Sequence, residues 1–300
     1  MGGCTLCCLS LQQGCSEHAH QVPVHGVPGT RHPLRRSPSR MGANRHGERG
    51  RVHAPADGGR ERRRDAEGAL QPLREGQRGL PGLGRERCGL ELQKLASKHP
   101  NLVIVPLEVT DPASIKAAAA SVGERLKGSG LNLLINNAGI ARANTIDNET
   151  LKDMSEVYTT NTIAPLLLSQ AFLPMLKKAA QENPGSGLSC SKAAIINISS
   201  TAGSIQDLYL WQYGQALSYR CSKAALNMLT RCQSMGYREH GIFCVALHPG
   251  WVKTDMGGTL EDKSRVTVDE SVGGMLKVLS NLSEKDSGAF LNWEGKVMAW

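Results

Sequence analysis

Residues 1–88 contain no lysine, no isoleucine and no phenylalanine, tyrosine or tryptophan, although they contain fifteen arginines. Isoleucine and the aromatic residues are among the side chains that build protein interiors. A segment without them buries too little apolar surface to offset the entropy lost when its backbone is ordered. We therefore expect residues 1–88 to be a disordered, arginine-rich extension and residues 89–300 to be the folded body.

The positive charge of the chain lies mostly in this first segment. Its 15 basic and 8 acidic side chains give a net charge of +7, so residues 89–300 account for only one of the eight net charges of the whole chain. A basic arm can attract nucleic acid or an anionic membrane. No aromatic platform, helix-turn-helix pattern or metal-finger spacing accompanies it, so we expect no nucleic-acid partner.

Long apolar runs are also missing, since none approaches the roughly 20 residues that a bilayer span requires. Residues 1–11 are apolar but lack a basic lead and a clear cleavage site, so they do not predict a signal peptide. Leu6 stands where a myristoylation motif needs serine or threonine. We expect no membrane partner and a cytoplasmic location.

Cysteine is present, but without the paired spacing of a disulfide scaffold, and the total of nine is odd. This usage fits a reducing cytosol. Six possible metal ligands lie close together near the N-terminus: Cys4, Cys7, Cys8, Cys15, His18 and His20. No second ligand pair follows at the usual separation, so we expect no metal site.

From residue 90 onward, short apolar runs alternate with helical patterns. Alternating strands and helices predict an α/β fold with a doubly wound parallel sheet of the Rossmann type. The expected strands are 102–109, 131–136, 193–199, 243–247 and 289–293. One helix is expected to end at residue 98. Four more are expected at 112–127, 151–181, 218–239 and 268–281, and Asp111 is the expected cap of the helix at 112–127.

Polar or glycine-bearing segments follow three of these strands. They are Asn136-Asn137-Ala138-Gly139, Asn197-Ile198-Ser199-Ser200 and His248-Pro249-Gly250-Trp251-Val252-Lys253-Thr254. The carboxyl ends of parallel strands meet at one edge of a sheet, where open α/β folds bind their ligands. We expect these three segments to line one crevice.

The next helix begins with Tyr219-Arg220-Cys221-Ser222-Lys223. Residues at i and i+4 share a helical face, so the Lys223 ammonium can favour the ionised form of the Tyr219 phenol. A phenol whose pKa moves from near 10 toward neutrality is a useful general acid. Ser200 could then bind the same substrate oxygen as Tyr219.

Each motif alone has a simpler explanation. Most tyrosine and lysine pairs at this spacing are neighbours on a helix surface. Asn136 to Gly139 could be a strand-ending turn, and Ser199-Ser200 could be a helix or turn cap. Together, in their order along one chain, the motifs are far more specific than any one of them alone.

In this order and spacing, the motifs resemble the short-chain dehydrogenase/reductase family from about Leu90 to Trp300. The stretches 219–228, 248–256 and 290–295 are similar to carbonyl reductases of the C-factor or Sniffer type. That group usually ends in proline and tryptophan, whereas this chain ends in Ala299 and Trp300. The resemblance implies an NAD(P)H-dependent oxidoreductase that reduces a small-molecule carbonyl compound.

The resemblance also implies roles for individual residues. Tyr219 would be the general acid, Lys223 would hold the nicotinamide ribose and tune the phenol, and Ser200 would bind the substrate oxygen. Asn161 would complete a proton relay, although a helix-interior asparagine bonded to backbone is its simpler explanation. The expected cofactor-binding residues on the adenosine side are Val109, against adenine, and Asn136, Ala138 and Gly139, near the ribose. Those expected near the nicotinamide are Tyr219, Lys223, Pro249, Gly250, Val252 and Thr254.

The family pattern favours NADP(H) over NAD(H) and a homodimer, but the residue that discriminates the two cofactors follows a strand that this chain lacks. The substrate pocket is expected from two loops, 203–218 and 257–264. Five large apolar or aromatic residues lie in the first: Leu208, Tyr209, Leu210, Trp211 and Tyr213. They could equally form a dimer contact or a lid.

One family element is missing from the sequence, namely the first strand with its glycine-rich pyrophosphate loop. Gly42-Ala43-Asn44-Arg45 resembles a fragment of that loop, but His46 and Glu48 stand where glycines are needed. Gly79, Gly82 and Gly84 have the wrong spacing. We expect the first β-α-β unit to be absent, which would leave the strands at 102–109 and 131–136 without the strands that join them.

The arginine-rich beginning looks like a stretch translated in another frame, or from an alternative exon, and joined to a reductase body near residues 88–90. This hypothesis leaves two functions open. One is an active carbonyl reductase. The other is an inactive product that lacks the dinucleotide loop and acts at most as a dimerisation partner.

Overall fold

The computed structural model describes residues 6–9, 92–183, 187–208, 211, 214–254, 256 and 265–300. They belong to one compact unit, formed by Met1–Val22 and Leu80–Trp300. A second unit, Pro23–Gly79, lies outside the described residues, as does most of the arginine-rich segment for which disorder was expected.

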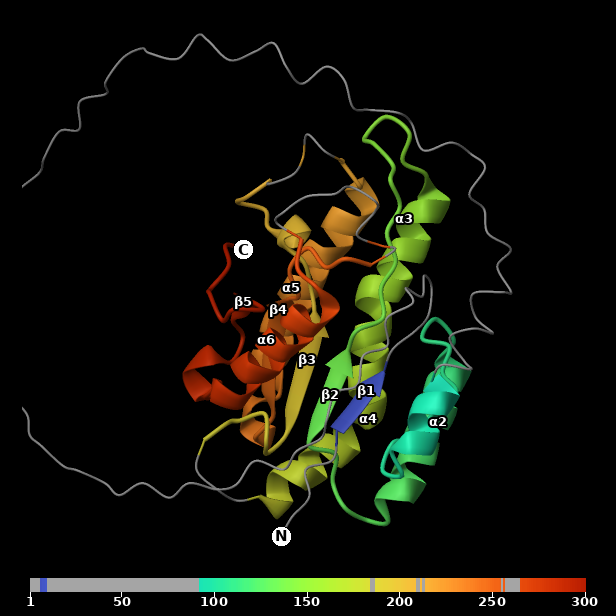
Figure 1. The fold of residues 1–300 in the computed structure, drawn as a ribbon, viewed down its shortest axis with the longest axis vertical. Helices are drawn as coiled ribbons and strands as arrows, with labels where there is room; N and C mark the ends of the chain where they lie inside the picture. Colours follow the sequence, from blue (N-terminus) through green and yellow to red (C-terminus); the bar gives the residue numbers. More distant parts are fainter. Residues whose placement is uncertain are drawn as a thin grey trace, which may run out of the picture. The chain divides into compact units, whose positions relative to one another are not determined.

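A five-stranded parallel sheet forms the centre of this unit (Figure 1), with the strands in the order in which they occur along the chain. The strands are β1 (Leu6–Leu9), β2 (Leu133–Asn136), β3 (Ala194–Ile198), β4 (Phe243–His248) and β5 (Phe290–Asn292). This confirms the predicted α/β fold with a parallel sheet.

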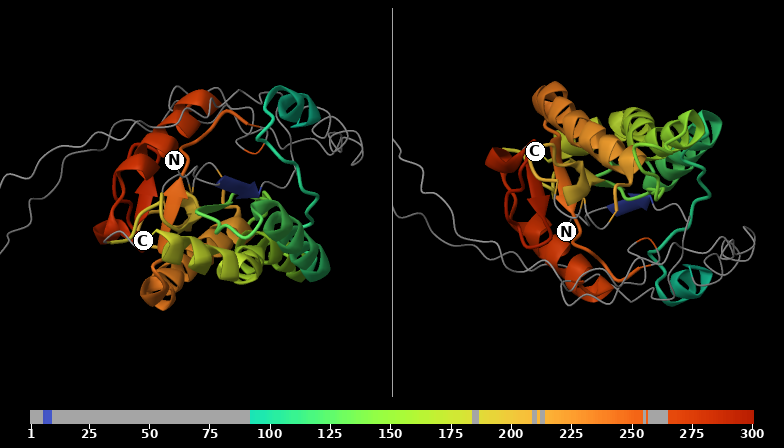
Figure 2. Two further views of the ribbon diagram at one scale, coloured as in Figure 1. Left: turned by 90° about the horizontal axis from the view of Figure 1, so that it is seen from below. Right: turned by 90° about the horizontal axis from the view of Figure 1, so that it is seen from above.

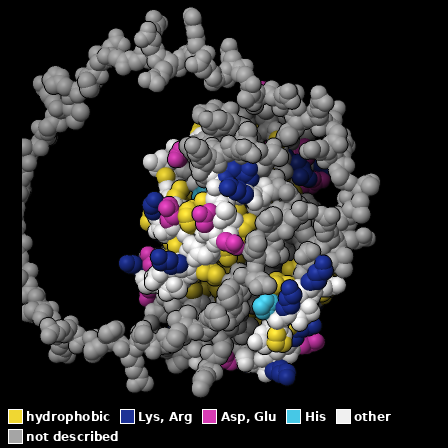
Figure 3. Space-filling view, in the orientation of Figure 1, with side chains coloured by type: hydrophobic (Ala, Val, Ile, Leu, Met, Phe, Trp, Pro, Cys, Tyr) yellow, Lys and Arg dark blue, Asp and Glu magenta, His cyan; other side chains and the backbone are white. Residues whose placement is uncertain are grey.

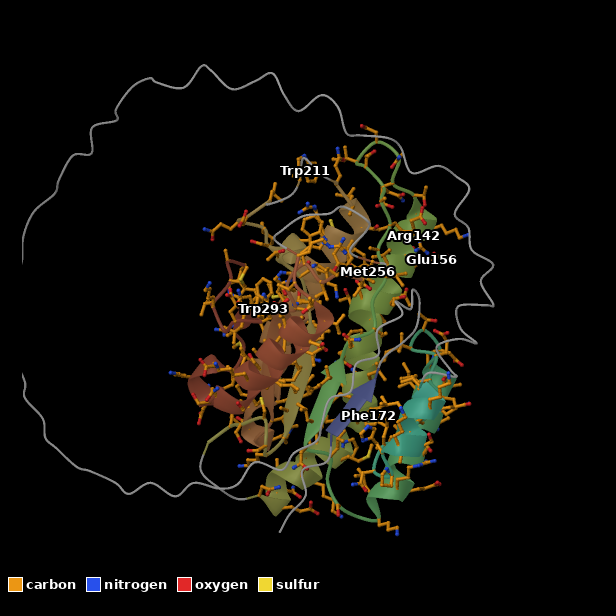
Figure 4. The ribbon with its side chains drawn as sticks, in the orientation of Figure 1. Arg142, Glu156, Phe172, Trp211, Met256 and Trp293 are labelled. Carbon is orange, nitrogen blue, oxygen red and sulfur yellow. The ribbon has the colours of Figure 1, made fainter. Side chains whose placement is uncertain are left out.

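Helices cover both faces of the sheet, as Figure 2 shows. On one face lie α2 (Pro112–Leu126), α4 (Ala164–Glu182) and α5 (Leu217–Gly236). The opposite face is covered by α6 (Val268–Asn281), whose Val278 and Leu279 pack with Leu133 and Val245. Leu176 and Phe172 of α4 are fully buried against the first face, where Phe172 is labelled in Figure 4.

The cap predicted for α2 is present. Asp111 has extended backbone angles, and its side chain accepts a hydrogen bond from the Ala113 amide at 2.9 Å. Pro112 occupies the first turn, where its missing N–H costs nothing. The helix ends at Lys127, whose left-handed φ of 49° stops it.

The helix predicted over 151–181 is one continuous rod with a change of winding. It consists of α3 (Leu151–Tyr158), a π-helical turn η1 (Thr159–Ile163) and α4. Such turns insert one residue into an α-helix and occur often at functional sites. Asn161 lies at the centre of this turn and is fully buried.

The strand predicted at 102–109 was wrong. These residues form no β-ladder, and Leu102, Val103 and Ile104 expose 39%, 52% and 39% of their surface. In the family order, the second strand would lie beside this segment. No strand lies beside it within the described part of the chain, so its backbone has no ladder to join.

The expectation that residues 131–136 would have no neighbour on their far side was also wrong. β1 pairs with β2 in parallel, with Leu6 opposite Leu133 and Leu9 opposite Asn136. The run Leu6-Cys7-Cys8-Leu9 was not predicted as a strand because it is short and no glycine-rich loop follows it. The residues after β1, up to 91, lie outside the described part.

Charges on the described surface are mixed. In the view of Figure 3, Lys and Arg side chains alternate with Asp and Glu rather than forming one large patch. This agrees with the small net charge of residues 89–300. No helix of the described part is long and apolar enough to span a bilayer.

Candidate active site

The three predicted segments meet at the carboxyl edge of the sheet. Parallel register places Asn136 opposite Asn197 and Ile198 opposite Leu247, so the exits of β2, β3 and β4 lie side by side. β2 leads into Ala138 and Gly139, and β3 leads into Ser199 and Ser200. The three segments that were expected to line one crevice therefore lie at the same edge of the sheet.

The first turn of α5 carries Tyr219, and Lys223 follows one turn later. The Lys223 Nζ lies 5.7 Å from the centroid of the Tyr219 ring. The lysine side chain is only 4% exposed, and Nζ donates a 2.7 Å hydrogen bond to the Ile198 carbonyl. A buried ammonium is therefore fixed beside the phenol by the last residue of β3.

Ser200 lies directly against the phenol. Its side chain forms a hydrogen bond with the Tyr219 side chain, and its Oγ also accepts the Ala202 amide at 3.2 Å. Ser200 has extended backbone angles and caps a short 3-10 turn, Thr201–Gly203. The two groups expected to bind one substrate oxygen are thus adjacent.

Burial dominates the ionisation of this pair. It raises the pKa of Tyr219, although the hydrogen bond from Ser200 lowers it in part. Burial also lowers the pKa of Lys223 from 10.5 to about 8. The sequence-based expectation was a phenol pKa lowered by the ammonium; instead, desolvation disfavours the charged form of both groups, and the ammonium hydrogen bond goes to Ile198.

Asn161 joins the crevice wall to α5. Its Oδ1 accepts the Ile140 amide at 2.9 Å, and its Nδ2 donates to the Ile140 carbonyl and to Ser222 Oγ, both at 2.9 Å. A Cβ on Gly139 would lie 3.4 Å from Asn161 Oδ1 and 3.6 Å from Lys223 Nζ. Asn161, Lys223 and Gly139 therefore converge, with the asparagine amide bonded to backbone.

A network of hydrogen bonds between buried polar side chains begins at Asn136, at the end of β2. Asn136 Nδ2 donates to Asn197 Oδ1 at 2.8 Å, and Asn197 Nδ2 donates to Thr230 Oγ1 and Gln233 Oε1 at 2.8 and 2.9 Å. The Gln233 Nε2 donates in turn to Ser169 Oγ at 3.0 Å. Asn136 and Asn197 both lie in the predicted strand-end segments, whereas Gln233 lies in no motif that could have singled it out.

One acceptor atom of this hydrogen-bond network has no partner among the described residues. Asn136 Oδ1 is buried and accepts no hydrogen bond from the described residues. An unsatisfied buried acceptor is costly and rare, so a donor is expected at this place. A ligand hydroxyl at the end of β2 would supply one.

Val109 and Ala138, predicted on the adenosine side, are placed differently. Val109 is fully buried and packs in the apolar cluster with Ile115 and Leu134. Ala138 is partly buried against the same cluster. Of these two, only Ala138 has exposed surface that a ligand could contact without rearrangement.

The segment after β4 is bound tightly to its neighbours. The Pro249 carbonyl accepts Ser271 Oγ at 2.6 Å, and Val252 forms a parallel bridge with Val266. Gly250 has a φ of +85°, and a Cβ there would lie 2.9 Å from atoms of Trp293 and Val266. Thr254 closes a turn through its amide, which donates to the Val252 carbonyl at 2.9 Å. Only glycine fits at position 250.

His248 is a residue of the site that the sequence gave no role. Burial, and secondarily the Lys223 charge, lowers its pKa to about 4, so the imidazole is neutral at pH 7. Its Nδ1 is buried with no partner within the described residues. Its position just before Pro249, at the end of a strand, was the available signal.

Part of the predicted substrate pocket lies outside the described residues, namely Tyr209, Leu210, Tyr213 and 257–264. Leu208 and Trp211 are described, and they expose 56% and 37% of their surface. The Arg220 guanidinium carbon lies 5.5 Å from the centroid of the Trp211 ring. The pocket and lid interpretations of this loop stay open.

The described residues are compatible with parts of a dinucleotide. Lys223, predicted on the nicotinamide side, offers a fixed ammonium. Asn136 and Gly139, predicted on the adenosine-ribose side, offer an acceptor that no described residue uses and a position without a side chain next to Asn161 and Lys223. The glycine-rich loop that would meet the pyrophosphate is the element missing from the sequence, and residues 10–91 lie outside the described part. Among the described residues, no group of three or more His, Cys, Asp or Glu side chains could hold a metal ion.

Comparison with known proteins agrees with this geometry. The family model for the short chain dehydrogenases matches residues 83–265. The C-signal protein of Myxococcus xanthus is 35% identical over 171 residues, which cover 57% of this chain and 93% of that protein.

Two solved structures show the same fold. The NADPH-bound carbonyl reductase from chicken fatty liver is 98% identical over 70% of this chain and 82% of its own, with a TM-score of 0.69. The carbonyl reductase Sniffer of D. melanogaster is 39% identical over 72% of this chain and 85% of its own, with a TM-score of 0.67. The predicted resemblance is confirmed, and the chain belongs to the short-chain dehydrogenase/reductase family.

Proposed function

We propose that this chain is an NADPH-dependent carbonyl reductase whose activity resides in residues 89–300. The observation that carries the proposal is the hydrogen bond between Ser200 and Tyr219, with the Lys223 ammonium fixed 5.7 Å from the phenol ring. The 98% identity to a carbonyl reductase described with NADPH bound supports the cofactor and the reaction.

A bound reduced nicotinamide supplies the hydride that reduces the carbonyl carbon. The residues of this chain bind the carbonyl oxygen and protonate it. The Ser200 and Tyr219 side chains are hydrogen-bonded neighbours, so a carbonyl oxygen placed beside them could accept hydrogen bonds from both hydroxyls. As negative charge develops on that oxygen, Tyr219 transfers its proton to it, so the products are an alcohol and the oxidised cofactor.

Lys223 supports this step through its charge. The phenolate that remains on Tyr219 is stabilised by an ammonium that burial shields from water. With a pKa of about 8, Lys223 is mostly protonated at pH 7. Lys223 also has donors left for a ribose hydroxyl, because its bond to Ile198 uses only one of three.

We further propose a cytoplasmic homodimer. Met228 and Met235 of α5 are 65% and 71% exposed and are seven residues apart, so they share one outer face of the helix. Cys221, Cys232 and Cys244 are free thiols, as in a reducing compartment. Light scattering on the purified chain measures the mass, and a monomer at micromolar concentration would contradict the dimer.

The test of function follows the hydride. The full chain is incubated with NADPH carrying deuterium at C4 of the nicotinamide and with a panel of aromatic ketones and quinones. We expect deuterium on the carbinol carbon of a ketone product, measured by mass spectrometry. No deuterated alcohol, and no NADPH binding by fluorescence titration, would overturn the proposal.

A further inference from the structure

The helix that carries Tyr219 begins without a cap of its own. The residue before α5 is Ala216, which has left-handed angles (φ 42°, ψ 53°) and no side chain that can accept a hydrogen bond. The first N–H groups of any helix lack partners within the helix. Their partners must therefore come from elsewhere.

Glu149 supplies an acceptor from a distant part of the chain. Its Oε2 accepts the Ser218 amide at 2.9 Å, and its Oε1 accepts Asn144 Nδ2 at 3.0 Å and the Thr150 amide at 3.1 Å. Burial opposes the charge, but these hydrogen bonds hold the pKa of Glu149 below its usual value. A carboxylate at this position also faces the positive end of the helix dipole.

Backbone contacts tie the same two segments together. The Leu217 amide donates to the Asn144 carbonyl at 3.3 Å, and the Ile146 amide donates to Gln215 Oε1 at 2.8 Å. The loop that precedes α3 is thereby joined to the turn that precedes α5. Glu149 is the charged member of this junction.

The loop is held in turn by α3. Asn144 Nδ2 also donates to Asp153 Oδ2 at 3.0 Å, and Arg142 pairs with Asp153 at 3.4 Å and with Glu156 at 3.1 Å. Figure 4 shows Arg142 and Glu156 next to each other. The loop that carries Glu149 is therefore held in place by α3.

We propose that Glu149 is a positioning residue for Tyr219, and this rests on the proposed function. Ser218, which Glu149 binds, directly precedes Tyr219, whereas Lys223 is anchored separately to Ile198. Loss of the carboxylate frees the first turn of α5 and moves the phenol away from Ser200. A displacement of about 1 Å can lower turnover on the order of 10²-fold, while the Lys223 side of the cofactor site stays in place.

The test compares three variants of the full chain. Glu149→Ala removes the acceptor, Glu149→Gln retains one oxygen toward Ser218, and Glu284→Ala breaks an exposed ion pair with Arg238 that lies outside this network. We expect Glu149→Ala to lower kcat about 10-fold to 100-fold and to leave the Kd of NADPH within about twofold. Glu149→Gln should restore most of kcat, and Glu284→Ala should behave as wild type.

Hydrogen exchange gives a readout that needs no activity. In Glu149→Ala, the amides of residues 218–220 should exchange faster, with 224–230 unchanged. Unchanged exchange at 218–220, or an unchanged kcat, overturns the positioning role. If Tyr219→Phe keeps wild-type turnover, the proposed function fails instead; if that variant is inactive and Glu149→Ala is fully active, only the role of Glu149 fails.

Discussion

Lys223 Nζ donates to the Ile198 carbonyl at 2.7 Å, so the last residue of β3 fixes the ammonium that lies 5.7 Å from the centroid of the Tyr219 ring. The sheet and α5 are therefore joined by a hydrogen bond next to Tyr219, the proposed proton donor. Disturbances of the contact between the β3 exit and α5 should therefore appear in catalysis as well as in stability.

Gly203 tests this contact. A Cβ at position 203 would lie 2.6 Å from the Lys223 carbonyl carbon and 2.8 Å from the Ala224 nitrogen, which is backbone that has no free space to move. Gly203→Ala should lower the free energy of unfolding by about 1–3 kcal/mol and lower kcat by moving α5. Gly273→Ala is the control, since nothing lies within 4 Å of its Cβ. Equal stability of the two variants in urea would contradict the packing described.

The pH dependence of turnover should reflect Lys223. Its pKa of about 8 lies below the ordinary lysine value, and burial raises that of Tyr219, so the lysine loses its proton first as pH rises. We expect kcat/KM for carbonyl reduction to fall as pH passes about 8, because the neutral amine no longer stabilises the phenolate. A profile that stays flat to pH 10 would contradict this role of the Lys223 charge.

His248 should make the fold sensitive to acid. Its folded-state pKa is about 4 against an ordinary 6.5, so between these values the unfolded chain binds a proton that the folded chain does not. Stability is complete above pH 6.5 and is lost as pH falls toward 4, by at most about 3 kcal/mol. His248→Asn should flatten the dependence of Tm on pH over this window. Parallel curves for the wild type and His248→Asn would refute this.

Asn161 should matter for stability as well as for turnover. Asn161→Ala removes three hydrogen bonds and leaves the Ile140 amide and carbonyl without their partner. We expect a loss of about 3 kcal/mol in unfolding free energy. Asn183→Ala, which removes one surface bond to the Ala179 carbonyl, should cost less than about 0.5 kcal/mol. If the two losses are similar, Asn161 does not hold the crevice wall as described.

Much of the fold followed from the sequence because its signals are local. Apolar runs bounded by turn residues marked β2, β3 and β4, and Asp111-Pro112 marked the start of α2. The segment at 102–109 has the same local pattern but is no strand, since strand formation depends on a neighbour. β1 shows the converse, because Leu6–Leu9 is unremarkable in sequence and gains its structure by pairing with β2.

The site was predictable to the same extent. Tyr219, Lys223 and Ser200 stood out because their residue types and order carry chemistry. Glu149, Gln233 and His248 did not, because each acts through a partner distant in the chain. The direction of the Tyr219 pKa shift also required the fold, since burial is not a property of the local sequence.

The most direct test of the central claim is the ratio of kcat between the full chain and its Tyr219→Phe variant, at saturating NADPH with a carbonyl substrate. The phenylalanine retains the ring but lacks the proton that the mechanism transfers. We predict a ratio on the order of 10² to 10⁴ with unchanged NADPH affinity. A full chain that reduces no carbonyl compound, or a variant as active as wild type, would contradict the assignment of Tyr219 as the acid.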